Sequence, residues 1–255
     1  TIDSMFKLGV KDSFFGHPPG LFVCFATELW ERFSFYGMKY LLLLYLTKYH
    51  LFSDSNGLEV LGSYAALVYA LPVIGGMLAD RYLGMRKAVI FGGVLLVIGH
   101  LGMALEGQQA RLLNGEIIRD EAALQFFYAS LALIIVGVGF LKPNISTIVG
   151  QLYAADDPRR DPGFTIFYMG INIGAFLSAL IIGGIGEEWG WHYGFGLAGI
   201  GMLLGQLVFM WGQKYLEGLA EPPSNKYLQK MNGISYESWA YISGIFMVLV
   251  TWFLV

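Results

Sequence analysis

The stretch Ala122–Leu141, AALQFFYASLALIIVGVGFL, decides the fold, because it runs for twenty residues without a charged side chain. A helix needs about 20 mainly apolar residues to cross the hydrocarbon core of a bilayer. The whole chain has the same character: its 255 residues are 56% hydrophobic and 14% charged, whereas an average soluble domain is about 25% charged. The sequence therefore predicts an all-α protein that crosses a membrane several times.

Five more apolar runs surround this one, and polar or glycine-containing breaks separate them. They are Leu21–Leu46, Val60–Ala79, Ala88–Leu105, Phe164–Gly186 and Phe195–Trp211. The run at Ala122 is also compatible with an extension to Tyr153. We therefore expect a six-helix unit over residues 1–215, a cytoplasmic linker over 216–237, and an additional apolar helix over 238–255. Because the last run reaches the chain end without a polar tail, the sequence is expected to stop partway through a larger protein.

The lysines and arginines predict the orientation, because cytosolic loops carry an excess of them. With a cytosolic N-terminus, three cations fall outside, namely Lys48, Arg111 and Arg119, and ten fall inside, namely Lys7, Lys11, Arg81, Arg86, Lys87, Arg159, Arg160, Lys214, Lys226 and Lys230. Residues 1–20 lack the apolar core of a signal peptide. We expect a multi-pass protein of the cytoplasmic (inner) membrane.

Several function classes are disfavoured by composition. The single cysteine, Cys24, excludes an internal disulfide and a CxxC pair. The net charge of −3 comes without a basic tract, which argues against nucleic-acid binding. An intramembrane enzyme would need a nucleophile with its base or paired aspartates, and no aspartate or GxSxG serine lies in a predicted span. We expect no catalytic residues, no metal and no cofactor other than a coupling proton.

The first span has a polar face. At about 100° per residue its polar residues share about 140° of helix surface; they are Glu28, Glu31, Arg32, Tyr36 and Lys39. A charge facing lipid costs about 2.5 to 3.5 kcal/mol on insertion scales, so this face should turn toward protein or a water-filled cavity. Glu28 and Arg32 are spaced as an i, i+4 pair. The alternative is that these charges only pair to hold helices together.

Lys142 precedes Pro143 in the fourth span. Proline removes a backbone donor and bends a helix, as expected of a span that lines a cavity. An ammonium at mid-depth could hold an anionic ligand group. The alternative places Lys142 at the helix end, where its side chain reaches the membrane interface.

Three segments together resemble the proton-dependent oligopeptide transporter family of the major facilitator superfamily. Residues 28–37, ELWERFSFYG, are similar to the family's ExxERF(Y/F)YG motif. Residues 75–87, GGMLADRYLGMRK, resemble its loop signature, and residues 164–176, FTIFYMGINIGAF, resemble its FYxxINxG signature. The resemblance covers most of residues 21–215.

The resemblance implies the N-terminal six-helix bundle of that superfamily, with a peptide site at the midplane and alternating access. By matched position, Glu28, Glu31 and Arg32 would couple the proton. The implied substrate-binding residues are Arg32, Tyr36 and Lys142 for the peptide carboxylate, Lys39 nearby, Tyr69 on the peptide, and Asn172 at its amino end. The implied function is proton-coupled symport of di- and tripeptides.

The loop motif contributes Asp80, Arg81 and Arg86. Either they have a gating role, in which Asp80 caps a helix or pairs with Arg81 or Arg86, or they only fix the topology. Phe35 stands where many members have a tyrosine. The family's second half, with its own carboxylates, is missing, so these residues alone should not transport. Residues 238–255 would be the first of two extra helices of bacterial members, in preference to helix seven. A transporter of another small anion or peptide-like solute, and a non-transporting sensor, remain alternatives.

Overall fold

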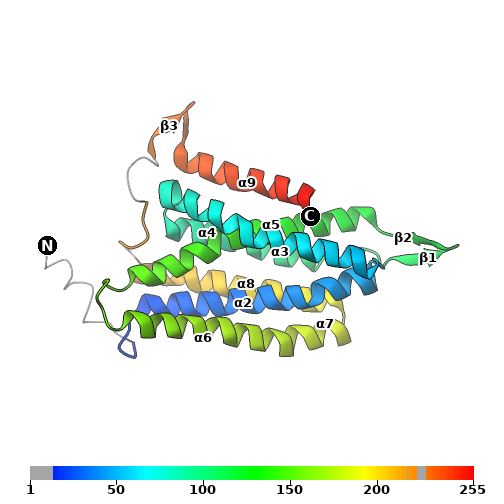
Figure 1. The fold of residues 1–255 in the computed structure, drawn as a ribbon, viewed down its shortest axis with the longest axis horizontal. Helices are drawn as coiled ribbons and strands as arrows, with labels where there is room; N and C mark the ends of the chain where they lie inside the picture. Colours follow the sequence, from blue (N-terminus) through cyan, green and yellow to red (C-terminus); the bar gives the residue numbers. More distant parts are fainter. Residues whose placement is uncertain (1–13, 217, 223–227) are drawn as a thin grey trace.

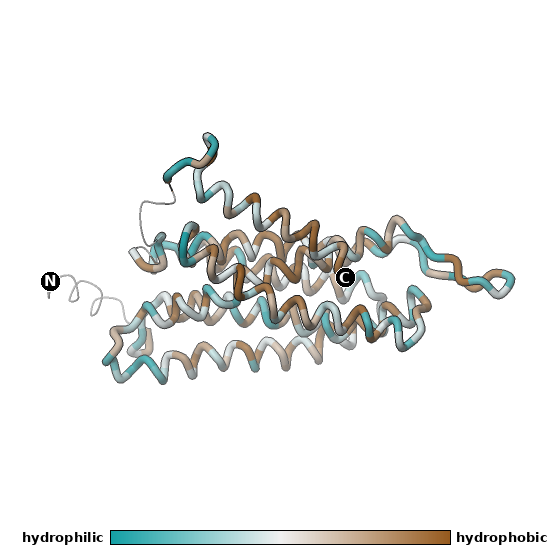
Figure 2. The backbone as a smooth tube through the Cα atoms, turned by 45° about the horizontal axis from the view of Figure 1, so that its top comes forward, coloured by the Kyte–Doolittle hydropathy of each residue, from teal (hydrophilic) through white to brown (hydrophobic). Residues whose placement is uncertain are grey.

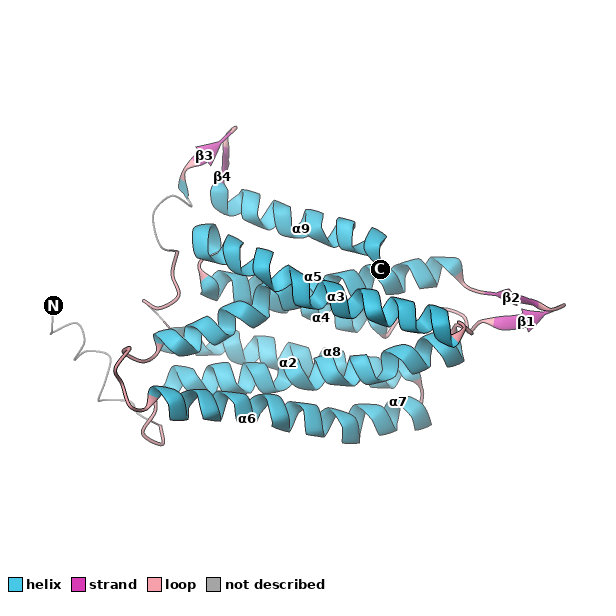
Figure 3. Ribbon diagram, viewed as in Figure 1, coloured by secondary structure: helices cyan, strands magenta, loops and turns pink. Residues whose placement is uncertain are grey.

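A computed structural model describes residues 14–216, 218–222 and 228–255. Lys7, Lys11 and Lys226, which contribute to the predicted orientation, lie outside these residues. Long helices run back and forth along one axis, with two small hairpins at the ends (Figures 1 and 3). The helical segments are α2 (Pro19–Leu44) with η1 (Tyr45–Tyr49), α3 (Asp54–Leu78) with η2 (Ala79–Leu83), α4 (Met85–Met103), α5 (Glu121–Gln151), α6 (Arg160–Ser178) with η3 (Ala179–Gly183) and α7 (Gly184–Glu188), α8 (Trp191–Trp211) with η4 (Gly212–Tyr215), and α9 (Tyr236–Leu254).

The packing of the first six spans has an internal two-fold pattern. The main pairs are α2 with α6 and α8, α5 with α3 and α4, and α4 with α8. Exchanging α2 with α5, α3 with α6, and α4 with α8 reproduces the same set of pairs. Since α2 and α5 run in opposite directions (Figure 1), the bundle consists of two three-helix units of inverted topology, an arrangement found in membrane transporters.

The helices agree with the predicted spans in number and order, and differ at their ends. Helix α5 continues through Pro143 to Gln151, so the longer version of the fourth span is correct. Helix α3 begins at Asp54, where a break was expected, because the Ser53 hydroxyl accepts a hydrogen bond from the Asn56 amide and caps the helix. The sequence did not predict the three π-helical segments η1, η2 and η3.

Among the described residues, six helices are long and apolar enough to cross a membrane. They begin at Asp54, Met85, Glu121, Arg160, Trp191 and Tyr236. Helix α2 is not one of them, and it carries the ionisable residues of the polar face. It instead packs against α6 and α8 within the bundle. Figure 2 shows polar residues at the two ends of the helices and apolar residues along their middle.

Glycines allow the central helices to approach closely. A Cβ on Gly75 of α3 would overlap the carbonyl oxygen of Gly139 on α5 and lie 2.6 Å from its carbon. A Cβ on Gly92 of α4 would lie 2.6 Å from the carbonyl oxygen of Gly137. Small residues at such crossings are typical of membrane helix pairs. Helix α5 is therefore in backbone contact with α3 and α4.

One end of the bundle carries a hairpin and a buried histidine. Strands β1 (Arg111–Leu113) and β2 (Glu116–Ile118) pair antiparallel and extend beyond the helices (Figure 3). Just after η1, His50 is fully buried, and neither ring nitrogen has a hydrogen-bond partner in the described structure. Burial, aided by the charge of Arg119, lowers the pKa of His50 to about 4. This histidine is therefore neutral at physiological pH.

The opposite end carries the second hairpin, which leads into α9. Strands β3 (Lys230–Met231) and β4 (Ile234–Ser235) form it, and α9 follows directly. Helix α9 packs mainly against α5. It lies at the outer edge of the bundle in Figure 1. Residues 236–254 thus form a helix that packs against the six-helix unit.

Candidate functional site: a buried charge cluster

Four ionisable side chains from α2 and α5 meet inside the bundle. The Arg32 guanidinium donates two hydrogen bonds to the Glu31 carboxylate. Its Nε also lies 3.4 Å from Oε1 of Glu28, and the same Glu28 oxygen accepts a hydrogen bond from Nζ of Lys142 at 3.0 Å. We call these four residues the charge cluster. It joins α2 to α5 through Glu28 and Lys142, which are 114 residues apart in the sequence.

The charge cluster is balanced and largely buried. With all groups ionised, two carboxylates offset one guanidinium and one ammonium, so the net charge is zero. Glu28, Glu31 and Arg32 are at most 3% exposed, whereas the Lys142 side chain is 36% exposed. Mutual pairing explains how such charges are tolerated there, because an unpaired buried charge is very costly. One oxygen, Oε2 of Glu28, has no hydrogen-bond partner within the described structure.

Lys142 points into the bundle. Its ammonium contacts Glu28 rather than a polar loop, so the interface alternative does not describe this structure. Helix α5 passes through Pro143 directly after it, and the missing proline N–H leaves the carbonyl of Gly139 without its intrahelical donor. That carbonyl faces Gly75 of α3. The proline thus occurs near the point where the backbones of α3 and α5 are in contact.

Aromatic rings surround the guanidinium on the other side. The Arg32 Cζ atom lies 4.4 Å from the ring centroid of Phe35 and 5.8 Å from that of Tyr36. Both distances are in the range of cation–π attraction. Phe35 in turn contacts Tyr64 of α3, with ring centroids 6.1 Å apart. Tyr64 is fully buried with its hydroxyl unpaired among the described residues.

The remaining predicted residues lie on accessible or half-buried surface, and of these only Tyr36 contacts the charge cluster within the described structure. Tyr36 and Tyr69 are 37% and 75% exposed, and Lys39 is half-buried with no ion pair in the described part of the chain. The exposed Asn172 donates to the Tyr168 carbonyl of its own helix at 3.3 Å. The structure therefore brings together Glu28, Glu31, Arg32 and Lys142, with Tyr36 beside them.

Backbone contacts nevertheless place these residues at a similar depth. On α6, two residues after Asn172, a Cβ on Gly174 would lie 3.1 Å from Cβ of Arg32. On α5, three residues before Lys142, a Cβ on Gly139 would lie 3.1 Å from Cβ of Leu71, two residues after Tyr69. Polar side chains of α2, α3, α5 and α6 thus occur at one level of the bundle, and α4 and α8 lie farther back in Figure 1.

Arg86 of the loop motif forms an ion pair with a partner that the sequence did not predict. Asp80 and Arg81 are exposed and form no ion pair among residues that the structure describes. Arg86 pairs with Glu221 of the linker, and its amide donates to the Ala220 carbonyl at 3.3 Å. The expected pairing of Asp80 with Arg81 or Arg86 is therefore absent from the described structure.

The linker is anchored on this loop through its backbone. Gly84 has φ +73°, and a Cβ there would lie 2.8 Å from the carbonyl oxygen of Ala220. The amide of Ala220 donates to Oε1 of Gln151 at the end of α5, at 2.8 Å. The segment after α8 is thereby fixed to the ends of α4 and α5.

Comparison with known families identifies the family of this chain. The POT family model matches residues 86–245. This chain belongs to the POT family. The resemblance seen in the sequence motifs is thereby confirmed, and with it a multi-pass membrane protein of the major facilitator type.

Several POT relatives and structures are similar to this chain. An uncharacterized transporter of Bacillus subtilis (strain 168), YclF, is 43% identical over 237 residues, which is 91% of this chain and 45% of the relative. A di-/tripeptide transporter of Lactococcus lactis subsp. lactis is 39% identical over 84% of this chain and 42% of the relative. The chain therefore spans less than half the length of these relatives.

Solved structures of POT proteins have the same fold. A crystal structure of a mutant of peptide transporter POT with alafosfalin matches with a TM-score of 0.78 and 40% identity, over 98% of this chain and 49% of that one. A POT family transporter in complex with a thioalcohol-conjugated peptide matches with a TM-score of 0.77 and 34% identity, over 96% and 47%.

Proposed function

We propose that these residues form the first half of a proton-coupled symporter of di- and tripeptides. The observation that carries the proposal is the balanced charge cluster next to exposed polar side chains of α2, α3, α5 and α6. The names of the Lactococcus relative and of the peptide-bound structures support peptides as the substrate class. The proposed second half covers this face, because both halves are needed to enclose a site between them.

The proposed coupling follows from charge balance. Protonating Glu28 or Glu31 removes one negative charge, so the cluster gains a net charge of +1. A buried net charge is costly, and an arriving peptide carboxylate restores balance by pairing with Arg32 or Lys142. Proton and peptide then favour each other's binding, since each offsets the charge that the other introduces. Tyr36, Lys39, Tyr69 and Asn172 would position the rest of the peptide.

The proposed location is the cytoplasmic (inner) membrane, with a cytosolic N-terminus. Cations support this orientation: seven described lysines and arginines lie at the ends of the helices where α2 begins, and three lie at the opposite ends. Asp80, Arg81 and Arg86 would then lie in the cytosol. We propose that Arg86 takes part in gating by holding the linker through Glu221, with Asp80 and Arg81 available to the second half.

The test is uptake of a labelled dipeptide by the complete transporter in liposomes with an inward proton gradient. Glu31→Gln is expected to lose gradient-driven accumulation and to keep exchange of peptide for peptide, because the guanidinium and ammonium remain. Lys142→Ala is expected to lose both. Lys48→Ala, a 57% exposed lysine at the opposite end from α2's start, is the control and should transport normally. Accumulation by wild type without any gradient would refute coupling to protons.

A further inference from the structure

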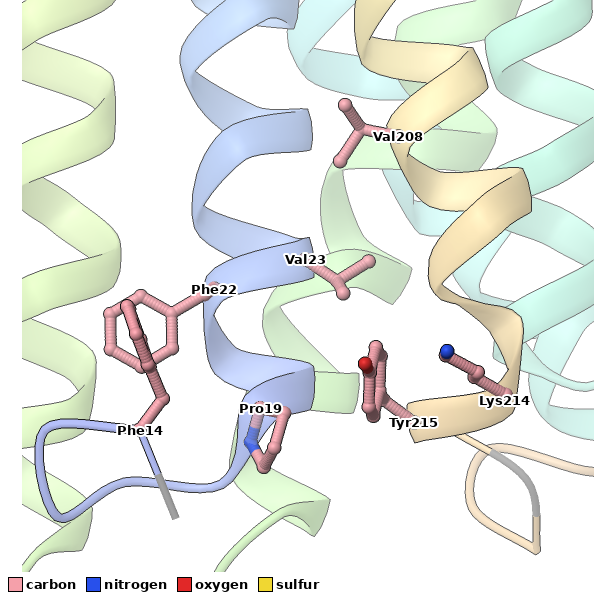
Figure 4. A pocket seen from close by; sticks show the side chains of 7 residues that line it. All are labelled: Phe14, Pro19, Phe22, Val23, Val208, Lys214 and Tyr215. Carbon is pink, nitrogen blue, oxygen red and sulfur yellow. The ribbon is translucent and has the colours of Figure 1, made fainter. Parts of the chain in front are cut away.

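A groove opens at the end of the bundle where α2 begins and α8 ends (Figure 4). Its volume is about 760 Å³. Val23 and Val208 line its inner part, and Phe22 lies on α2 nearby. Lys214 and Tyr215 line it at the end of α8. The inner part of the groove is thus apolar, and its outer end offers a cation and a phenol beside Phe14 and Pro19.

This groove is separate from the charge cluster. Val23 precedes Arg32 by nine residues, which at about 100° per residue places the two on opposite sides of α2. The adjoining surface of α8 is apolar and exposed: Leu204 and Trp211, which share the helix face of Val208 at i−4 and i+3, are 39% and 75% exposed. In a membrane protein such a surface faces lipid, so the groove opens to the bilayer rather than to a peptide site.

Aromatic residues place the mouth of the groove at headgroup depth. Trp211 closes α8 and is 75% exposed, as expected of a tryptophan at a membrane interface. Lys214 follows one turn later, with Nζ 4.9 Å from the ring centroid of Tyr215. An ammonium and a phenolic O–H are both donors to a phosphate oxygen. None of the described residues that line the groove is acidic.

We propose that this groove binds one anionic phospholipid of the cytosolic leaflet. Its phosphodiester would contact Lys214 and Tyr215, and one acyl chain would lie along Phe22, Val23 and Val208. Both features are needed to identify the ligand, because a free phosphate would use only the polar end and a neutral detergent only the apolar one. The proposal rests on the proposed cytosolic orientation of this end and is independent of peptide transport.

The experiment is native mass spectrometry of the protein purified in neutral detergent and titrated with phosphatidylglycerol or phosphatidylcholine. Wild type is expected to retain one phosphatidylglycerol in preference to phosphatidylcholine. Lys214→Gln should weaken phosphatidylglycerol binding about fivefold, as expected for one cation near an anionic lipid, and leave phosphatidylcholine unchanged. Lys230→Gln is the matched control, since Lys230 is an exposed lysine on β3 at the same end. Val208→Trp should fill the groove and weaken both lipids.

Three results would overturn the proposal. Equal retention of the two lipids by wild type would remove the preference for an anionic headgroup. Equal weakening by Lys214→Gln and Lys230→Gln would indicate general attraction between charges instead of a site. Displacement of phosphatidylglycerol by millimolar inorganic phosphate would identify a free-anion site. The thermal midpoint of each variant without lipid, expected to equal that of wild type, separates lost binding from lost folding.

Discussion

Charge balance predicts that two damaging substitutions will destabilise the protein less in combination than the sum of their separate losses. Lys142→Gln leaves two carboxylates with one guanidinium, and Glu28→Gln leaves two cations with one carboxylate. Each single variant therefore places one uncompensated charge in a region where Glu28 is 1% exposed. The double variant returns the cluster to zero net charge, with Arg32 still bound to Glu31.

The magnitude follows from the geometry of the bridge. Two unit charges 3.0 Å apart attract by about 5 kcal/mol at an effective dielectric constant of roughly 20. The Lys142 side chain is 36% exposed, so water screens the pair and reduces this to about 2 kcal/mol. We expect each single variant to lose about 2 kcal/mol, and the double variant to lose about 2 rather than the additive sum of about 4.

The assay is thermal unfolding in one detergent at one pH, followed by tryptophan fluorescence for wild type, both single variants and the double variant. A loss of about 2 kcal/mol corresponds to a midpoint lower by roughly 4 to 8 °C. If the double variant loses the sum of the single losses, Glu28 and Lys142 are not coupled and the charge-balance reasoning is wrong. Equal stability of all four proteins would mean that the bridge contributes nothing.

Three further predictions concern packing, pH and the linker. Gly75→Ala should destabilise the protein by about 1 to 3 kcal/mol, because the new Cβ meets backbone. At Gly62 on the same helix a Cβ would have nothing within 4 Å, so Gly62→Ala should not destabilise it. Similar thermal midpoints for the two variants would contradict this. Folding lowers the pKa of His50 from its usual 6.5 to about 4. The free energy of unfolding should therefore fall by up to about 3 kcal/mol as the pH drops from 6.5 to 4. His50→Leu should flatten that part of a plot of thermal midpoint against pH. Glu221→Gln should lower the free energy of unfolding by less than about 1 kcal/mol, because Glu221 is 42% exposed in its pair with Arg86. A larger loss, measured by thermal unfolding, would show that this ion pair, and not the backbone contacts, holds the linker.

The sequence predicted the spans and the polar face because both depend on local spacing. Apolar runs of the required length are visible residue by residue, and so is a helix face that carries Glu28, Glu31 and Arg32. The contact between Lys142 and Glu28 was not predictable in this way, since it depends on how α2 and α5 pack. The motif suggested a ligand for Lys142, whereas the structure gives it a carboxylate of the protein itself.

The ends of the helices were also predicted incorrectly from the sequence. Capping by Ser53 extends α3 outward, and π-helical turns prolong α2, α3 and α6. A π-helical turn adds one residue to the hydrogen-bonded ring without changing composition, so hydropathy carries no signal for it. The partner of Arg86 was also missed, because Glu221 lies in a linker whose position depends on contacts with Gly84 and Gln151.

The glycine crossings also determine where the bundle can deform. Backbones in direct contact at Gly75 and Gly139, and at Gly92 and Gly137, cannot slide without steric overlap, so the middle of the bundle is stiff. The π-helical turns η1, η2 and η3, whose hydrogen bonding is less regular, begin where α2, α3 and α6 stop. We therefore expect bending to concentrate near the membrane surfaces, while the distances among the buried charges stay nearly constant as either end opens.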